Sequence, residues 1–144
     1  MTDYAPEVEV GEMVGDGVVH TFLAGSAITK GQLVKLSDGT NLEVVPATLN
    51  SNVIGVALKA ASSSGEYIPV LLHGIVKLTL GTVTGTLAAG SALKSDDDGK
   101  PIELADQPVD EGGSSTYTIY YNAKVGVSLQ SGQTGNSILV KVEK

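Results

Sequence analysis

Apolar and polar side chains alternate along much of the chain with the two-residue period of a β-strand. The clearest run covers residues 66–73, in which successive side chains would project to opposite faces of a sheet. Pro69 lies inside this run and predicts a sheet edge or a bulge there, because proline has no N–H to donate to a neighbouring strand. Shorter runs of the same kind lie at 18–24, 32–36, 42–47, 52–58, 75–80, 116–121 and 138–142.

The helical period is missing from the same pattern. No window of about eleven residues keeps its apolar positions 3.6 residues apart, so any helix is expected to be a turn or two long. Eighteen glycines, a single phenylalanine and no tryptophan accompany the strand-like runs. Glycine supplies tight turns, and Val, Thr, Ser, Leu and Ala fill the runs between them. The sequence therefore predicts an all-β fold built from many short strands.

The second half of the chain repeats a pattern of the first half. Residues 28–35 and 87–94 both read apolar-x-x-Gly-x-apolar-apolar-Lys, and each is followed by an Asp-Gly turn. This order predicts an internal duplication with halves 28–72 and 87–142, the second of which carries an insertion near 106–121. Two such halves predict one small β-barrel or sandwich with pseudo-symmetry, whereas a solenoid needs three or more repeats. The later matches, in the same order, are 42–44 with 102–104, 55–58 with 126–129, and 65–70 with 135–140.

Length and charge narrow the function classes. The chain has 144 residues, enough for one domain with a sizeable core and too few for two typical ones. Its nine basic residues are all lysines and its acids number sixteen, which gives a formal net charge of −7. Without arginine, and with an acidic surface, the protein is not expected to bind nucleic acid. Its apolar stretches are too short to predict a membrane span, and the N-terminus lacks the pattern of a signal peptide.

Candidate chemistry is sparse. His20 and His73 each alternate with apolar residues in a strand-like run, and a metal site would need both together with a carboxylate. Residues 62–65 are expected to be a hairpin tip, because no Gly-x-Ser-x-Gly elbow leads into a helix. The acids at 96–98 are consecutive and lack the spacing of calcium ligands, so a solvated turn is expected. The sequence predicts no catalytic residue, no metal site and no cofactor, and the protein is not expected to be an enzyme. Cysteine is absent, which removes disulfides and thiolate chemistry.

Residues 1–17, called here the N-terminal arm, differ from the rest of the chain. The arm carries five acids and three glycines, and its alternation at 7–10 is brief. Two interpretations are open: a frayed terminus, or a segment that orders on a partner by adding a strand to a sheet. Residues 18–144 are expected to form a single β domain.

Several runs of the sequence resemble those of a known protein family. The runs at 24–36, 53–57 and 65–70, followed by Gly74, resemble the small capsid cement, or head-decoration, proteins of tailed phages and related viruses. The resemblance covers residues 18–80 well and the second half more weakly. The second copy departs from the family pattern, because Ala89 replaces the lysine that precedes the glycine and because of the insertion.

The resemblance implies a β-barrel-like or β-tulip domain that binds the outer surface of an assembled capsid. It implies that the protein is made in the host cytoplasm and sits on the virion as trimers at three-fold or quasi-three-fold positions, bound to the major capsid protein and to its own copies. Such a protein stabilises the mature shell mechanically. The N-terminal arm is the expected contact with the capsid. Its candidate binding residues are Tyr4, Pro6, Val8 and Val10.

Two other functions stay open on the sequence alone. One is a structural module of a viral tail, spike or fibre. The other is a small non-enzymatic β-barrel that binds a ligand such as a carbohydrate, for which the missing tryptophan is a poor sign because sugar sites use aromatic platforms. Copy number per virion distinguishes the first alternative from a cement protein, since a decoration protein is present in hundreds of copies and a tail part in a handful.

Overall fold

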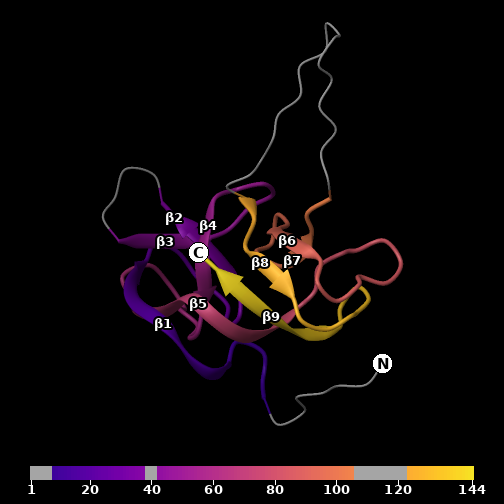
Figure 1. Ribbon diagram of the computed structural model, residues 1–144. Helices are drawn as coiled ribbons and strands as arrows, with labels where there is room; N and C mark the ends of the chain where they lie inside the picture. The colour runs from indigo at the N-terminus through magenta and orange to yellow at the C-terminus, as the bar shows by residue number, and fades with distance from the viewer. Residues whose placement is uncertain (1–7, 38–41, 106–122) are drawn as a thin grey trace, which may run out of the picture.

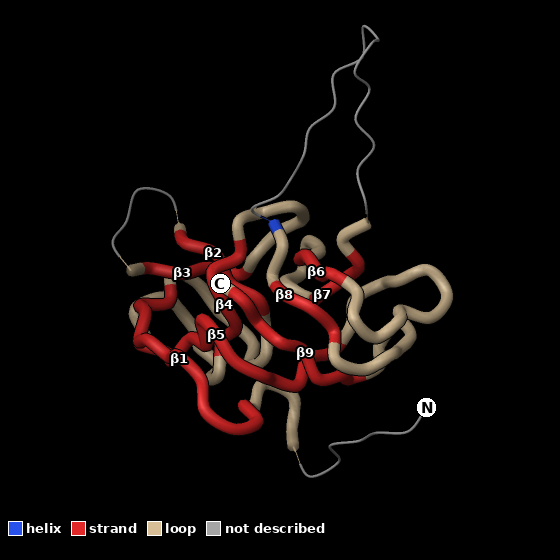
Figure 2. The backbone as a smooth tube through the Cα atoms, viewed as in Figure 1, coloured by secondary structure: helices blue, strands red, loops and turns tan. Residues whose placement is uncertain are grey.

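A computed structural model describes residues 8–37, 42–105 and 123–144, and these residues form one continuous β-sheet of nine strands (Figures 1 and 2). Strands make up about half of the described residues, and the expected strand at 116–121 lies outside them. The all-β prediction is confirmed, and no helix in the described ranges is long and apolar enough to cross a membrane. The strands are β1 (Met13–Ala24), β2 (Leu33–Leu36), β3 (Glu43–Pro46), β4 (Val53–Ala57), β5 (Tyr67–Thr79), β6 (Ala92–Ser95), β7 (Pro101–Glu103), β8 (Gly126–Ser128) and β9 (Ser137–Glu143).

Five of these strands close into a ring. The sheet runs in the order β1-β3-β2-β4-β5, and an antiparallel pairing between β1 and β5 completes the circle. The pairing of β1 with β3 is parallel, and the other pairings in the ring are antiparallel. Inside the ring lies an apolar cluster whose burial stabilises the closed form. Its buried members are Phe22, Ala24, Ile28, Val34, Val44, Ala57, Ala61, Ile68 and Val70.

Strand β5 leaves the ring and begins a second group of strands. Its residues 73–79 pair with β9, and the sheet continues as β5-β9-β8-β6-β7. Strand β7 is held to the end of β5 by a hydrogen bond from Gly81 N to Pro101 O at 2.9 Å. We call β1 to β4 with residues 67–73 the first unit. We call residues 74–79 with β6 to β9 the second unit.

The two units make the same hydrogen bonds at matched positions. The glycine of the apolar-x-x-Gly step has a φ of 87° at Gly31 and 88° at Gly90, a backbone conformation that favours glycine. The glycine step and the last strands of the repeat therefore take part in corresponding pairings, but residues 102–104 correspond in the sheet to 45–47 and not, as the sequence predicted, to 42–44. The matched bonds include Gly31 N–Ala57 O with Gly90 N–Ser128 O, Leu58 N–Pro69 O with Leu129 N–Leu139 O, and Ala24 N–Glu66 O with Leu80 N–Asn136 O.

Pro69 lies inside the sheet and not at its edge, which corrects the expectation of an edge strand. It sits in β5 one residue beyond the paired part of β4, and its carbonyl accepts from Leu58 N at 2.9 Å. The matched residue of the second unit, Leu139, donates its N–H to the side chain of Gln130 at 2.9 Å. The ladder does not require an N–H at this position, so proline is tolerated there.

The turn at 96–99 joins the two units. Asp97 and Asp98 are exposed, as a solvated turn predicts, but Gly99 is buried and its carbonyl accepts from Leu33 N at 2.8 Å. A Cβ on Gly99 would meet the side chain of Gln32 at 2.5 Å, which explains the glycine. Three further hydrogen bonds cross the joint. They are Gln32 Nε2–Asp98 O at 2.8 Å, Leu49 N–Asp97 Oδ1 at 3.2 Å and Lys94 Nζ–Asn50 Oδ1 at 2.8 Å.

The larger apolar core spans this joint. Leu33, Val53 and Leu71 of the first unit belong to the same buried cluster as Leu93 and Val125 of the second. Burial at about 25 cal/mol per Å² makes such a shared core the main force that holds the units together. The two units are therefore parts of one folded body.

Candidate functional site

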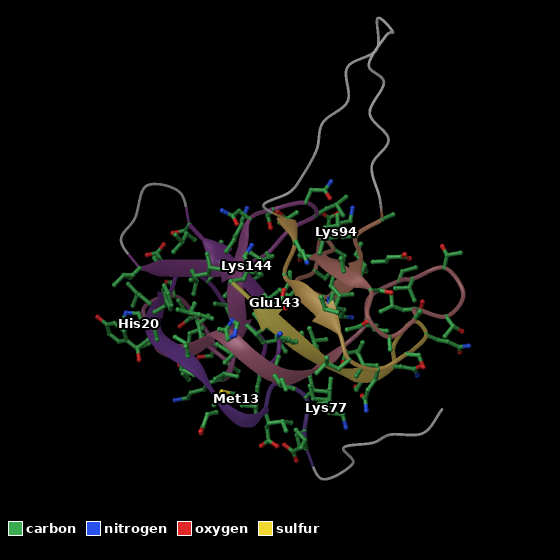
Figure 3. All side chains as sticks on the ribbon, in the orientation of Figure 1. Met13, His20, Lys77, Lys94, Glu143 and Lys144 are labelled. Atoms are coloured by element: carbon green, nitrogen blue, oxygen red, sulfur yellow. The ribbon has the colours of Figure 1, made fainter. Side chains whose placement is uncertain are left out.

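The histidines lie apart from any candidate metal site. His20 is exposed on β1 (Figure 3) and makes an edge-to-face contact with Phe22, with ring centroids 5.3 Å apart. His73 is exposed on β5. Within the described ranges, no group of three or more His, Asp or Glu side chains is placed to hold a metal ion.

The serine-rich segment 62–65 is a turn fastened by Glu66. The Glu66 carboxylate accepts from Ser62 N at 2.6 Å, from Ser62 Oγ at 2.9 Å and from Ser63 N at 3.0 Å. The hydrogen bond from the Ser63 backbone, followed by those from Ser62, lowers the pKa of Glu66 below its ordinary value of 4.5. This arrangement closes the turn, because one carboxylate accepts from two backbone N–H groups and one hydroxyl of neighbouring residues.

Acidification is expected to loosen this turn. Because the folded-state pKa of Glu66 is lowered, its contribution is present above pH 4.5 and is lost as the pH falls below that value, through the folded-state pKa. Amide hydrogen exchange of Ser62 and Ser63, corrected for intrinsic rates, should accelerate below pH 4.5 in the wild type. In the Glu66→Gln variant exchange should already be fast at pH 7. Equal protection in the two proteins at pH 7 would contradict this role.

The described part of the N-terminal arm lies against the domain. Gly11 N donates to Lys77 O at 2.8 Å, and Lys77 N donates to Glu12 O at 3.2 Å. Figure 3 shows Met13 and Lys77 on this side of the molecule. The Glu12 carboxylate also lies 3.8 Å from the ammonium group of Lys30. Residues 8–12 therefore follow the surface of the folded domain.

Of the four predicted capsid-binding residues, Val8 and Val10 can be placed, and Tyr4 and Pro6 lie outside the described residues. Val8 and Val10 are half-buried while Glu9 between them is exposed, in keeping with the alternation of the sequence. Val10 lies in a hollow beside Gly31, lined also by residues 98–100 of the second unit.

The expected boundary after residue 17 falls inside a strand. Strand β1 begins at Met13, and Met13 and Val14 pair with Val76 and Ile75 of β5. The pairing resumes at Val18, after residues 15–17 bulge out.

An apolar groove opens at one end of the five-strand ring. It has a volume of about 610 Å³. Leu36 and Leu42 at its rim are 46% and 53% exposed, which is unusual for large aliphatic side chains. No catalytic group lines the groove, so its composition fits contact with another apolar surface. The lining residues are Phe22, Leu36, Leu42, Asn52, Val53, Ile54, Leu72 and Lys144.

Lys144 brings a positive charge to this groove. The ammonium group of Lys144 donates to Lys124 O at 2.9 Å and to Asn52 Oδ1 at 3.5 Å. The backbone N–H of Lys144 donates to Leu72 O at 3.1 Å. Figure 3 shows it at the end of β9, beside the first unit. Partial burial lowers the pKa of Lys144 from its ordinary value of 10.5, because the charged form loses hydration.

The groove could not be predicted from the sequence. Its residues come from four strands, β1, β2, β4 and β5, and from segments next to β3, β4 and β9, and no local motif connects them. One signal was available in the comparison of the two halves. Leu36 before the first Asp-Gly turn is a large apolar residue, whereas the matched position before the second turn is Ser95.

Comparisons with known proteins address both the fold and the family. The N base of head fiber gp8.5 of bacteriophage phi29 has a similar fold, with a TM-score of 0.61 over 88% of this chain and 93% of that chain. The two sequences are 19% identical over this match. No curated protein matches the chain. The family model of phage cement proteins matches residues 13–143, which include all nine strands. The chain therefore belongs to the phage cement protein family.

Proposed function

We propose that the protein is a capsid decoration protein that binds the outer surface of the mature capsid and stabilises it mechanically. It would be made in the host cytoplasm, bind the major capsid protein, and sit as trimers at three-fold or quasi-three-fold positions. The match to the cement family over residues 13–143 is the observation that carries this proposal.

The physical basis is preferential binding to one state of the shell. A protein that binds the expanded capsid more tightly than the separated subunits shifts the equilibrium towards the intact particle. Such a function needs contact surface and rigidity and requires no reactive group. The shared apolar core and the hydrogen-bonded joint between the two units supply that rigidity.

The fold proposal is more specific than an all-β sheet. We propose that the first unit is a small β-tulip-like barrel and that the second unit arose by duplication of the first. The matched hydrogen bonds at Gly31 and Gly90 support this origin. The matched isolated bridges Ile28–Ala61 and Leu87–Gly132 support it as well.

The test of the function is co-sedimentation with capsids. Purified protein is mixed with undecorated expanded capsids and, separately, with unexpanded capsids of the same phage. We expect saturable binding to the expanded particle, with a stoichiometry of hundreds of copies. Absence of binding to expanded capsids would reject the proposal.

The N-terminal arm is proposed to be part of the capsid contact, with Tyr4, Pro6, Val8 and Val10 as its binding residues. Deleting residues 1–17 would remove the beginning of β1, so the sharper variant deletes residues 1–7, which removes no contact made among the described residues. This variant should melt like the wild type and bind expanded capsids at least about tenfold more weakly, because a short edge-pairing segment contributes through main-chain hydrogen bonds and alternate side chains. Replacing Asp3 and Glu7 by Asn and Gln is the matched control for charge alone. Unchanged capsid affinity after the deletion would remove Tyr4 and Pro6 from the binding site.

A second candidate is the base of a head fibre. The fold similarity to the N base of the phi29 head fiber supports it. A cement protein and the base of a head fibre would both bind the capsid. They differ because only a fibre base would have a longer fibre protein attached to it. Quantitative mass spectrometry of virions would distinguish them if a longer fibre protein is found at the same copy number and co-purifies with this chain.

A further inference from the structure

Five of the residues that line the apolar groove have buried counterparts in the second unit. Matching the strand pairings of the two units identifies these counterparts. At the rim the contrast is large: Leu36 is 46% exposed and Ser95 is 0% exposed. The aligned pairs are Phe22 with Leu78, Leu36 with Ser95, Leu42 with Gly99, Ile54 with Val125, and Leu72 with Val142.

The first unit covers this end of the second unit. Gly99, the counterpart of Leu42, lies against Gln32 and accepts from Leu33 N. Val125 and Val142 share a buried cluster with Leu33 of the first unit. The end of the second unit thus packs on the side of the first, where β2 and the segment after β3 provide the surface.

The arrangement is therefore head-to-tail within one molecule. If a two-fold axis related the halves, each unit would cover the matching end of the other. Instead the end of the first unit stays open as the apolar groove. The matching ends of the two units therefore differ: the end of the second unit is covered by the first unit, and the end of the first unit is not covered by the second.

A second copy of the covering surface lies on the second unit and is half-buried among the described residues. The counterparts of Gln32, Leu33 and Ala47 in the second unit are Ser91, Ala92 and Leu104. All three are half-buried. In the first unit Leu33 and Ala47 are fully buried under the second unit. The side of the second unit therefore corresponds to the side of the first unit, which the end of the second unit covers.

We propose that the apolar groove of one molecule receives the side of the second unit, Ser91, Ala92 and Leu104, of a second copy of the chain. The joint inside each molecule would then be repeated between molecules. Two observations favour this occupant. Val53 lines the groove and also belongs to the core of the internal joint, so the groove continues an interface that the chain already makes. The groove also carries the ammonium group of Lys144, and the second unit carries an exposed carboxylate at Glu103, the residue before Leu104 in the chain.

The contact is heterologous, because the two partners use different surfaces. Repeating it generates a closed ring if the rotation between copies closes, and an open chain if it does not. A three-membered ring is the form that would suit a three-fold position, so the inference adds an interface to the proposed trimer. It rests on the fold alone and does not require capsid binding.

Engineered cysteines test the contact directly, since the chain has none of its own. By analogy with Gly99 and Leu33, the closest pair across the contact is Leu42 of one copy and Ala92 of the next. The double variant Leu42→Cys/Ala92→Cys should form disulfide-linked oligomers under mild oxidation, and equimolar mixing of the two single variants should give linked dimers. Each single variant alone should stay unlinked. Crosslinking of Leu42→Cys with itself would show a groove-to-groove contact and would overturn the proposal.

A second measurement avoids the need for a disulfide. Light scattering and sedimentation of the full chain over a range of concentrations report association. Leu36→Asp with Leu42→Asp should weaken association by about tenfold or more, because apolar contact area is lost. Val18→Asp is the matched control, since Val18 is 56% exposed on β1 and does not line the groove. Thermal melts show whether each variant is folded.

The outcomes separate this inference from the proposed function. Both assays are run free in solution and on expanded capsids. If no crosslink forms in either condition and groove variants still bind capsids, the second-copy proposal is wrong and the capsid proposal stands. If the groove variants lose capsid binding without any sign of self-association, the groove belongs to the capsid protein and the proposal is again wrong. If crosslinks form but no protein binds capsids, the second-copy proposal stands and the cement function fails.

Discussion

Replacing Gly126 by alanine is expected to destabilise the protein by about 3 kcal/mol or more, near the upper end for overpacked sites. A Cβ at this position would overlap the carbonyl of Lys141 in β9, and the obstacle is backbone that cannot move without shifting the strand. Gly55 stands in the same relation to the carbonyl of Leu71 in the first unit, so Gly55→Ala should have an effect of similar size. Thermal or urea unfolding measures both. A loss of this size lowers the Tm by about 6 to 12 °C.

Gly135→Ala is the matched control for these variants. Gly135 has a φ of 83° but nothing lies within 4 Å of its Cβ position. Its substitution therefore carries the cost of the left-handed backbone alone, about 1 to 2 kcal/mol. If Gly126→Ala were no less stable than Gly135→Ala, strands β8 and β9 would not approach each other as closely as the structure has them.

Decorated capsids are expected to withstand heat and internal pressure better than stripped capsids of the same phage. Each bound copy opposes separation of the capsid subunits by its differential affinity for the intact shell. A preference of about 2–3 kcal/mol, roughly 100-fold, is modest for one copy. The many copies on one shell sum to a large effect, and self-association would add effective concentration because one assembly holds several capsid subunits.

The experiment compares DNA release on heating for decorated capsids, stripped capsids, and stripped capsids to which the protein has been restored. We expect release at a lower temperature from stripped particles and recovery on restoration. The 1–7 deletion is an internal comparison, since it should restore stability only at higher protein concentration. Equal release temperatures for decorated and stripped particles would remove the cementing role and favour surface display or host adhesion.

The fold class and much of the strand pattern could be predicted because they follow from local chemistry. Alternation identifies strands, and the glycines at 31 and 90 mark the same turn in both units because each needs a positive φ. The start of β1 could not be predicted in this way. Residues 15–17 are rich in glycine and look like a break, but the strand continues through them as a bulge beside β5. The start of β1 depends on pairing with residues about sixty positions further along the chain, as the pair Val14 and Ile75 shows.

The joint between the units and the apolar groove could not be predicted from the sequence, because both depend on contacts between distant parts of the chain. The acids at 96–98 are typical of a solvated turn, and two of their side chains are indeed exposed. The backbone contacts of Asp98 with Gln32 and of Gly99 with Leu33 depend on how the units dock, which no local pattern encodes. The predicted contacts of the N-terminal arm remain a prediction, because nothing in the fold tests them.

Strand β5 passes through both units without interruption, and this has a mechanical consequence. Its thirteen residues are nearly fully extended at about 3.3 Å each, so the strand has little slack. A tensile load that enters one half of the molecule and leaves through the other is carried along covalent peptide bonds before it reaches the non-covalent joint. The seven residue pairs between β5 and β9 would be loaded in shear, so that they resist together and do not open one after another. The molecule should therefore be stiff along β5, and single-molecule pulling between the two ends of this strand should show little extension, because the strand is already nearly extended.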